Sequence, residues 1–309
     1  MTQRDESIDA FRGLAIVMMV PANYLEHIAV VPPWLKHAPD VGLTVIDFVA
    51  PFFMFAIGLT MPGSLRRRFE KSGGQATVEH VLRRGLALIG LGALFSLGET
   101  SYGFNAKGIQ WGTLQAIGAA SMVVAPFVFV RPVFRLGAAV VLLVGYQWGL
   151  ETMWLEQVLA SPQAGLPGVL SWSALLMLAT VVGDVLPSGK VGVGGVISLI
   201  AGVALSFVIP LSKHRMSIPF VLVTFGAAVI VFLLMRRVRA PAFLLAWGKN
   251  PLVMYCAHLV LLGAFLVPEA RWWHFEAGVG QAIVQFVAYA LVLHLIAIAL
   301  ERRRIFVTL

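Results

Sequence analysis

The sequence predicts an all-α fold, a polytopic membrane helical bundle of about ten transmembrane helices (ten or eleven). Apolar stretches of roughly 17 to 25 residues recur along the whole chain, and each is long enough to cross a bilayer as a helix. Of the 309 residues, 59% are hydrophobic and 12% are charged, which is about half the charge of an ordinary soluble domain. No soluble segment or internal repeat interrupts the pattern, so residues 1–309 are expected to form a single transmembrane domain.

The apolar runs place the expected helices in order along the chain. They fall at residues 9–30, 41–64, 78–98, 111–130, 133–150, 167–186, 191–211, 217–236, 248–267 and 277–300. Tryptophans fall near several of the expected ends, as an aromatic belt at the two membrane interfaces would place them. The connection at 151–166 is partly apolar and is the candidate for an additional interfacial helix.

Lysine and arginine predict the orientation of these helices. With the N-terminus inside, 18 of the 23 basic residues fall on inner segments and five on outer segments. This is the bias of the positive-inside rule, and it predicts an even number of spans with both termini cytoplasmic. The outer five are Lys36, Lys107, Lys213, Arg215 and Arg271.

Composition excludes several classes of function. The net charge of +8 is explained by topology, so no nucleic-acid partner is expected. Cys256 is the only cysteine, which leaves no disulfide framework or thiolate cluster, and no metal is expected. The zinc-protease, Walker and nucleophile-elbow motifs are absent, so those hydrolase classes lack support.

His37 and Asp47 are the most informative polar residues. His37 lies in the short connection between the first two apolar runs, on the predicted outer side, and Asp47 follows inside the second run. An ionisable group within a span is costly and usually marks a function. Pro51 has no N–H, so it leaves the carbonyl of Asp47 without its helical partner. An imidazole beside a carboxylate indicates proton transfer at a membrane face. The alternative is a structural acid paired with a basic residue elsewhere.

The first expected helix carries a polar stripe. Asn23 follows Arg12 by eleven residues, which places both on nearly one face and about 16 Å apart along the axis. Asp9 is three residues before Arg12 and is expected to pair with it. Taken alone, this stripe is best explained structurally, by an interfacial salt bridge together with an interhelical hydrogen bond from Asn23.

Ordered polar motifs recur within otherwise interchangeable apolar sequence. They are Ser7-Ile8-Asp9-Ala10-Phe11-Arg12-Gly13-Leu14, Asn23-Tyr24, Lys36-His37-Ala38 and Gly42–Val49 with Pro51, Phe52, Phe55 and Gly58. Further motifs are Leu82-Arg83-Arg84, Gly112–Gly118 around Leu114-Gln115, and Gly248-Lys249-Asn250 with Tyr255 and His258. Together these segments resemble the catalytic region of the heparan-α-glucosaminide N-acetyltransferase family and its bacterial relatives. The chain departs from the family at Leu25-Glu26-His27, where a glycine-rich stretch is more usual.

The resemblance implies a membrane-embedded acyltransferase that takes acetyl from cytoplasmic acetyl-CoA to an extracytoplasmic sugar amine or hydroxyl. His37 then corresponds to the catalytic histidine, acting as base or as transient acetyl carrier, and Asn23 to the motif asparagine. Asp47 is expected to orient the imidazole, and Asn23 to donate a hydrogen bond to the thioester oxygen. Candidate ligands of the CoA moiety are Arg12, Arg83, Arg84, Lys249 and Asn250.

A glycan or amino-sugar acceptor and membrane lipids are the other partners expected, and a homodimer is the assembly considered. The expected location is the bacterial inner membrane. Two other classes of function remain open from the residues alone. A proton-coupled transporter or lipid flippase would line a solute path with the same polar stripe, and a structural membrane scaffold would leave the clustered polar residues without a purpose.

Overall fold

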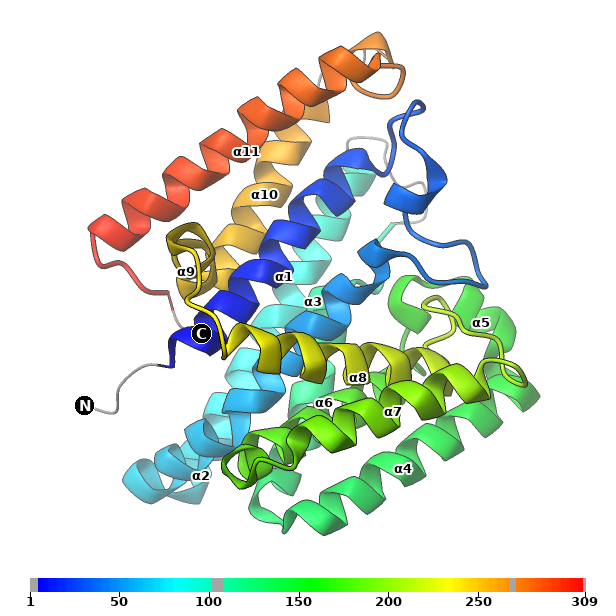
Figure 1. Cartoon of the computed structure of the whole chain (residues 1–309), viewed down its shortest axis with the longest axis vertical. Coiled ribbons are helices and arrows are strands. Elements are labelled where there is room, and N and C mark those ends of the chain that lie inside the picture. Colours follow the sequence, from blue (N-terminus) through cyan, green and yellow to red (C-terminus); the bar gives the residue numbers. More distant parts are fainter. Residues whose placement is uncertain (1–4, 102–107, 267–270, 308–309) are drawn as a thin grey trace. The chain divides into compact units, whose positions relative to one another are not determined.

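The computed structural model describes residues 5–101, 108–266 and 271–307, and within these ranges the regular elements are helices, with no β-strand (Figure 1). The main helices are α1 (Glu6–Leu25), α2 (Val49–Ser101), α3 (Thr113–Val124), α4 (Pro132–Gly149), α5 (Leu155–Leu159), α6 (Val169–Val185), α7 (Val191–Leu205), α8 (Ile218–Met235), α9 (Ala242–Lys249), α10 (Pro251–Leu266) and α11 (Val279–Arg302). The all-α prediction is therefore confirmed.

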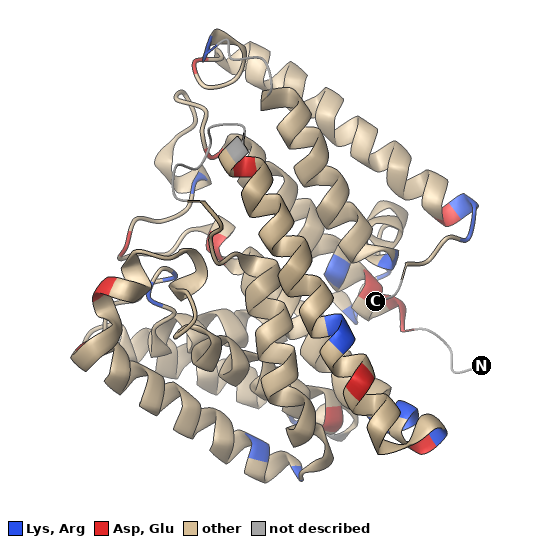
Figure 2. Cartoon of the chain, turned by 180° about the vertical axis from the view of Figure 1, so that it is seen from behind, with Lys and Arg blue, Asp and Glu red and all other residues tan. Residues whose placement is uncertain are grey.

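Five of these elements are long and apolar enough to cross a membrane: Glu6–Leu25, Val45–Thr100, Pro132–Leu159, Ile218–Met235 and Val279–Arg302. The pair α9 and α10, bent by 89°, makes a sixth if it is one span. Valine, leucine and isoleucine are exposed along α4, α7 and α11, as they would be against lipid. Lys, Arg, Asp and Glu lie mostly near helix ends and in connections, away from the apolar middles (Figure 2). The count of ten spans and the cytoplasmic termini remain predictions.

The helices expected at 41–64 and 78–98 correspond to the two parts of α2 (Val49–Ser101), which are separated by a sharp kink at Gly73. Gly73 has φ of 79° and ψ of 175°, a conformation that glycine adopts without steric cost. At the other end, residues 45–48 form a 3₁₀ turn. Pro51 lies in the first turn of α2, where proline is well tolerated because its missing N–H would have no intrahelical partner there.

The helix expected at 248–267 is also interrupted. Asn250 has non-helical φ and ψ of −130° and 59°, and Pro251 follows as the first residue of α10. A residue before proline is pushed out of the α region by the proline ring, which explains why the chain bends here. Elsewhere the expected helices end earlier than predicted, most clearly α1 at Leu25 and α7 at Leu205.

The described helices belong to two compact units. The terminal unit comprises Met1–Ala38, Thr44–Val49 and Phe232–Leu309, and the central unit comprises Pro39–Leu43 and Ala50–Val231. The prediction of one domain over residues 1–309 remains a prediction.

In the terminal unit, α1 packs directly against α9. A Cβ added at Gly13 would lie 2.0 Å from the carbonyl oxygen of Leu244, and one added at Gly248 would lie 1.7 Å from that of Asp9. Both positions therefore require glycine for the close approach of two backbones. Asp5 caps the start of α1 by accepting the N–H of Ser7 at 3.0 Å. The two segments Asp9–Gly13 and Gly248–Asn250, far apart in sequence, thus meet at one end of this unit.

The central unit has α6 as its most enclosed helix, with buried residues along most of Val169–Val182. Here too, glycines allow helices to approach closely. Gly58 faces Ala179 of α6, Gly118 of α3 faces Gly85 of α2, and Gly226 of α8 faces Gly195 of α7. Small residues of this kind favour tight helix packing in membranes, where no hydrophobic effect drives helices together.

Candidate active site

His37 and Asp47 form an ion-pair-type contact in the terminal unit. Nδ1 of His37 lies 2.8 Å from Oδ1 of Asp47. The His37 side chain is 26% exposed, whereas the Asp47 side chain is fully buried. A buried carboxylate bonded to Nδ1 fixes the orientation of an imidazole and directs its other nitrogen, Nε2, away from the carboxylate.

Asp47 lies in the 3₁₀ turn Val45–Phe48, at the start of the candidate span Val45–Thr100 and just before α2. Its Oδ2 accepts the backbone N–H of Thr44 at 2.9 Å, while its own N–H donates to the carbonyl of Thr44 at 3.1 Å. The bond to Oδ2 is the one that the N3 side chain makes in a capping box, and the bond to the Thr44 carbonyl closes the 3₁₀ turn. The hydroxyl of Thr44 lies 2.8 Å from the carbonyl of Lys36, which ties the turn to the residue before His37.

Glu26 supports His37 through the backbone. Its Oε2 accepts the N–H of His37 at 3.1 Å. Close by in sequence, Nζ of Lys36 donates to the carbonyl of Ile28 at 2.8 Å, so the connection folds back on the end of α1. In the sequence, Glu26 is only part of a departure from the family pattern, and no spacing predicts its hydrogen bond with the His37 backbone.

The short segment between His37 and Asp47 has its own anchors, in the central unit. Asp40 forms a two-armed ion pair with Arg215 and accepts a hydrogen bond from the hydroxyl of Ser212. The Arg215 guanidinium holds the pKa of the Asp40 carboxyl below its usual value. Gly42 donates its N–H to the carbonyl of Leu211 at 2.9 Å.

Asn23 has a partner that sequence analysis did not pair with it. Its Nδ2 lies 2.8 Å from Nε2 of His258 on α10, a residue 235 positions away. His258 is fully buried. Both residues lie in segments of family resemblance, but only the packing of α1 against α10 brings them together.

A buried aromatic and polar network adjoins Asn23. The hydroxyl of Tyr24 donates to Oε1 of Gln285 at 3.0 Å, and the hydroxyl of Tyr289 donates to the carbonyl of His258 at 2.8 Å. Tyr24 and Tyr289 are stacked with ring centroids 5.3 Å apart. The network links α1, α10 and α11, and so holds the Asn23 end of α1 in a defined position.

His274 borders the same network, outside the candidate spans. Its ring lies edge-on to Tyr24 at 5.0 Å and next to Phe275. The ring is buried, and neither nitrogen has a hydrogen-bond partner among the described residues. Burial, followed by the nearby His27, lowers the pKa of His274 to about 4. This imidazole is therefore neutral at pH 7.

The candidate CoA ligands of the terminal unit lie at its other end. Arg12 contacts Asp9 at 3.4 Å, as expected, and Lys249 pairs with Glu301 near the end of α11. The amide of Asn250 is engaged by the chain after α11, donating to the carbonyl of Ile305 at 2.9 Å and accepting the N–H of Val307 at 3.0 Å. Asn250 thus holds the segment that follows α11 in place through two hydrogen bonds.

The remaining two candidates, Arg83 and Arg84, lie on α2 in the central unit. Both are exposed, and Arg83 pairs with Glu79 one turn earlier. Arg84 has no such pair among the described residues. Within the described residues, no group of three or more His, Cys, Asp or Glu side chains is arranged to hold a metal ion.

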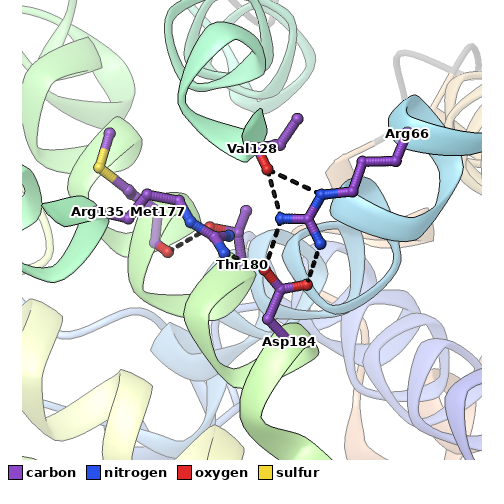
Figure 3. Close-up of polar contacts among 6 residues, drawn as sticks. All are labelled: Arg66, Val128, Arg135, Met177, Thr180 and Asp184. Atoms are coloured by element: carbon purple, nitrogen blue, oxygen red, sulfur yellow. Dashed lines mark hydrogen bonds and ion pairs between the residues drawn. The ribbon is translucent and has the colours of Figure 1, made fainter. Parts of the chain in front are cut away.

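The central unit contains a polar cluster whose arginines served, in the sequence, only to predict the orientation of the helices in the membrane. Asp184 on α6 binds Arg66 of α2 through two contacts of 2.9 and 2.8 Å, and it also binds Arg135 of α4 (Figure 3). Arg66 also donates to the carbonyl of Val128. Arg135 is fully buried, and its Nε and Nη1 have no partner among the described residues. One carboxylate therefore holds two arginines from two other helices.

Comparison with known proteins gives the family. The model of the catalytic region of heparan-alpha-glucosaminide N-acetyltransferase matches residues 4–167, more than half of the chain. The human protein of that name is 31% identical over 205 residues, covering 62% of this chain and 28% of the human protein. The mouse protein is 35% identical over 138 residues, covering 41% and 20%. The matched part thus spans less than a third of these relatives. The chain is an integral membrane protein that belongs to the heparan-alpha-glucosaminide N-acetyltransferase family.

Proposed function

We propose that this protein transfers acetyl from cytoplasmic acetyl-CoA to an extracytoplasmic amino-sugar or glycan acceptor, at an amine or a hydroxyl. The observation that carries the proposal is the contact between His37 and the buried carboxylate of Asp47. Family membership supports acetyl transfer, and the excess of Lys and Arg on one set of connections supports the orientation.

The reaction assigned to His37 is general base catalysis. The acceptor amine attacks the thioester carbonyl, a C–N bond forms, and the C–S bond breaks to release the CoA thiolate. Nε2 of His37 takes the proton from the amine, and that proton neutralises the thiolate. Asp47 acts through Nδ1, where its charge stabilises the imidazolium as it forms. In the variant with an acetyl carrier, Nε2 attacks the thioester first, an N–C bond forms, and the C–S bond breaks to release the CoA thiolate. The acceptor then takes the acetyl group, the N–C bond breaks, and the proton of the acceptor neutralises the thiolate.

Asn23 is assigned the stabilisation of negative charge on the thioester oxygen. An amide N–H aimed at the position of this oxygen gains strength as charge develops in the transition state. Asn23 lies in the last two turns of α1, the helix end from which the connection carrying His37 departs. Arg12 lies three turns earlier on the same helix, about 16 Å away along its axis.

That spacing supports a donor molecule extended along the terminal unit. The charged CoA groups would lie near Arg12, Lys249 and Asn250, and the pantetheine arm would reach towards Asn23. Arginine is well suited to phosphate because its fork donates two parallel hydrogen bonds. Arg83 and Arg84 are proposed as further phosphate ligands. The protein is proposed to reside in a bacterial inner membrane, in contact with lipids and as a homodimer.

The direct test uses purified protein in detergent with radiolabelled acetyl-CoA and glucosamine. We expect acceptor-dependent CoA release that falls at least 100-fold in His37→Ala, while acetyl-CoA binding is retained. His80→Gln, on α2, is the matched control and is expected to keep wild-type activity. A His37→Ala protein that folds, binds acetyl-CoA and retains full transfer would remove the role of His37. Absence of both binding and CoA release in the wild type would remove the enzyme proposal.

The transporter alternative has its own assay. Proteoliposomes loaded with labelled amino sugar would lose the label without any acetyl donor if the polar stripe lines a solute path. The proposal predicts that the labelled amino sugar stays inside, and that it becomes acetylated only when acetyl-CoA is present on the opposite side of the membrane.

A further inference from the structure

We propose that His258 is a positioning residue that sets the orientation of the Asn23 amide for acetyl transfer. The inference rests on the proposed function and extends it to α10, outside the segment matched by the family model, which ends at residue 167. The observation is the contact of 2.8 Å between Nδ2 of Asn23 and Nε2 of His258.

The direction of this hydrogen bond follows from the chemistry of the two groups. The amide nitrogen of Asn23 is a donor only, so Nε2 of His258 must accept and must carry no proton. A neutral imidazole then carries its proton on Nδ1. Nδ1 makes no hydrogen bond with a described residue, so no donor at that position opposes its protonation.

This bond leaves Asn23 with a second N–H to offer. An amide nitrogen has two hydrogens, and His258 takes one of them. Asn23 makes no other side-chain hydrogen bond with a described residue. Because His258 fixes the plane of the amide, the remaining N–H points in one direction. The amide therefore loses little conformational entropy when the transition state forms. Preorganised donors are the kind that stabilise an oxyanion most effectively.

His258 is itself held rigidly. Its side chain is fully buried, its ring lies edge-on to Tyr255 at 5.2 Å, and its carbonyl accepts the hydroxyl of Tyr289 at 2.8 Å. Tyr289 in turn stacks on Tyr24, the neighbour of Asn23 on α1. The imidazole and the amide are thus positioned by the same buried network, which explains why a bond between residues so distant in sequence has a fixed geometry.

A double-mutant cycle tests the proposal. We expect His258→Ala to lower kcat about 10- to 100-fold, within the loss that removal of an oxyanion donor produces, and to leave the KM for acetyl-CoA within about twofold. In the Asn23→Ala background the same change should cost less than about threefold, because His258 acts through Asn23. His258→Gln should recover part of kcat, since its Oε1 can accept the Asn23 N–H. Equal losses in both backgrounds would overturn the proposal.

His294→Gln is the matched control, because it replaces another histidine of the terminal unit, whose Nδ1 accepts the indole N–H of Trp247 at 3.0 Å; we expect less than a threefold change in kcat. A second readout does not depend on activity. The ¹⁵N chemical shifts of labelled histidine should show His258 protonated on Nδ1, with an Nε2 shift that moves in Asn23→Ala. If the Nε2 chemical shift of His258 does not change in Asn23→Ala, the proposed hydrogen bond between the two side chains is wrong. An inactive wild type with the expected shifts would instead overturn the proposed function alone.

Discussion

Glu26, one of three residues where the chain departs from the family pattern, accepts the backbone N–H of His37 at 3.1 Å and so holds the proposed catalytic histidine in place. The bond joins the end of α1 to the connection beyond it. It fixes the His37 backbone from one side, while Asp47 fixes the side chain from the other.

This relationship predicts a graded effect at residue 26. Glu26→Ala should lower kcat about three- to tenfold, because the His37 backbone loses an acceptor to a charged group, a bond of about 1.5–3 kcal/mol. Glu26→Gln retains an acceptor oxygen and should stay within about twofold of wild type. Initial rates of acetyl transfer for the three proteins check the prediction, and equal activities in all three would contradict it.

The charge of Asp47 is expected to be required for catalysis, in addition to the hydrogen bonds by which its side chain stabilises the turn. Asp47→Asn keeps the size of the side chain but removes the charge that stabilises a His37 imidazolium, so kcat should fall at least 100-fold. Asp40→Asn, at the carboxylate nearest in sequence to His37, is the control and should fall less than fivefold. The prediction fails if both variants lose activity to the same extent while remaining folded by size-exclusion chromatography.

The close approach of α1 and α9 predicts a steric defect. Gly248→Ala would place a Cβ 1.7 Å from the carbonyl oxygen of Asp9, and overpacking of this kind typically costs about 1–3 kcal/mol of unfolding free energy. Gly263→Ala, on α10, meets nothing within 4 Å and should be neutral or slightly stabilising. Thermal unfolding followed by intrinsic tryptophan fluorescence compares the two, and similar melting temperatures would contradict the packing.

His274 predicts an acid-sensitive stability. Burial lowers its pKa to about 4 in the folded state, below the value of about 6.5 in an unfolded chain. Because the unfolded chain then binds the proton more readily, stability falls as the pH drops from about 6.5 towards 4, by an amount on the order of 1–2 kcal/mol. His274→Phe should reduce this loss, measured as the difference in melting temperature between pH 7.5 and pH 5. An unchanged pH dependence would rule out His274 as its source.

The Asp184 cluster predicts a strong structural dependence in the central unit. Asp184→Asn leaves the buried guanidinium of Arg135 without its counter-charge, and uncompensated buried charges typically cost about 3–5 kcal/mol. Glu79→Gln, which breaks the exposed pair with Arg83, should cost less than about 1 kcal/mol. Melting temperatures of both variants decide this, and a stable Asp184→Asn protein would contradict the role given to the cluster.

Much of the molecule follows from local features of the sequence. The apolar runs predict helices near their observed positions, since the length of a span and its apolar character depend on neighbouring residues only. The proximity of His37 and Asp47 was also expected, because ten residues separate them. The separation of the apolar runs at 41–64 and 78–98 agrees with the kink at Gly73. The break at Asn250 was not expected within 248–267, although the following Pro251 explains it locally.

The sequence by itself determined the all-α class, the family and the residue types at the candidate site. Only the tertiary structure decided the partners: Asn23 with His258, Glu26 with the His37 backbone, and Asp184 with two arginines. The physical reason is the environment of the side chains. Inside a span nearly every neighbour is apolar and interchangeable, so sequence spacing cannot show which polar group meets which. A buried donor still requires an acceptor, and only helix packing supplies one.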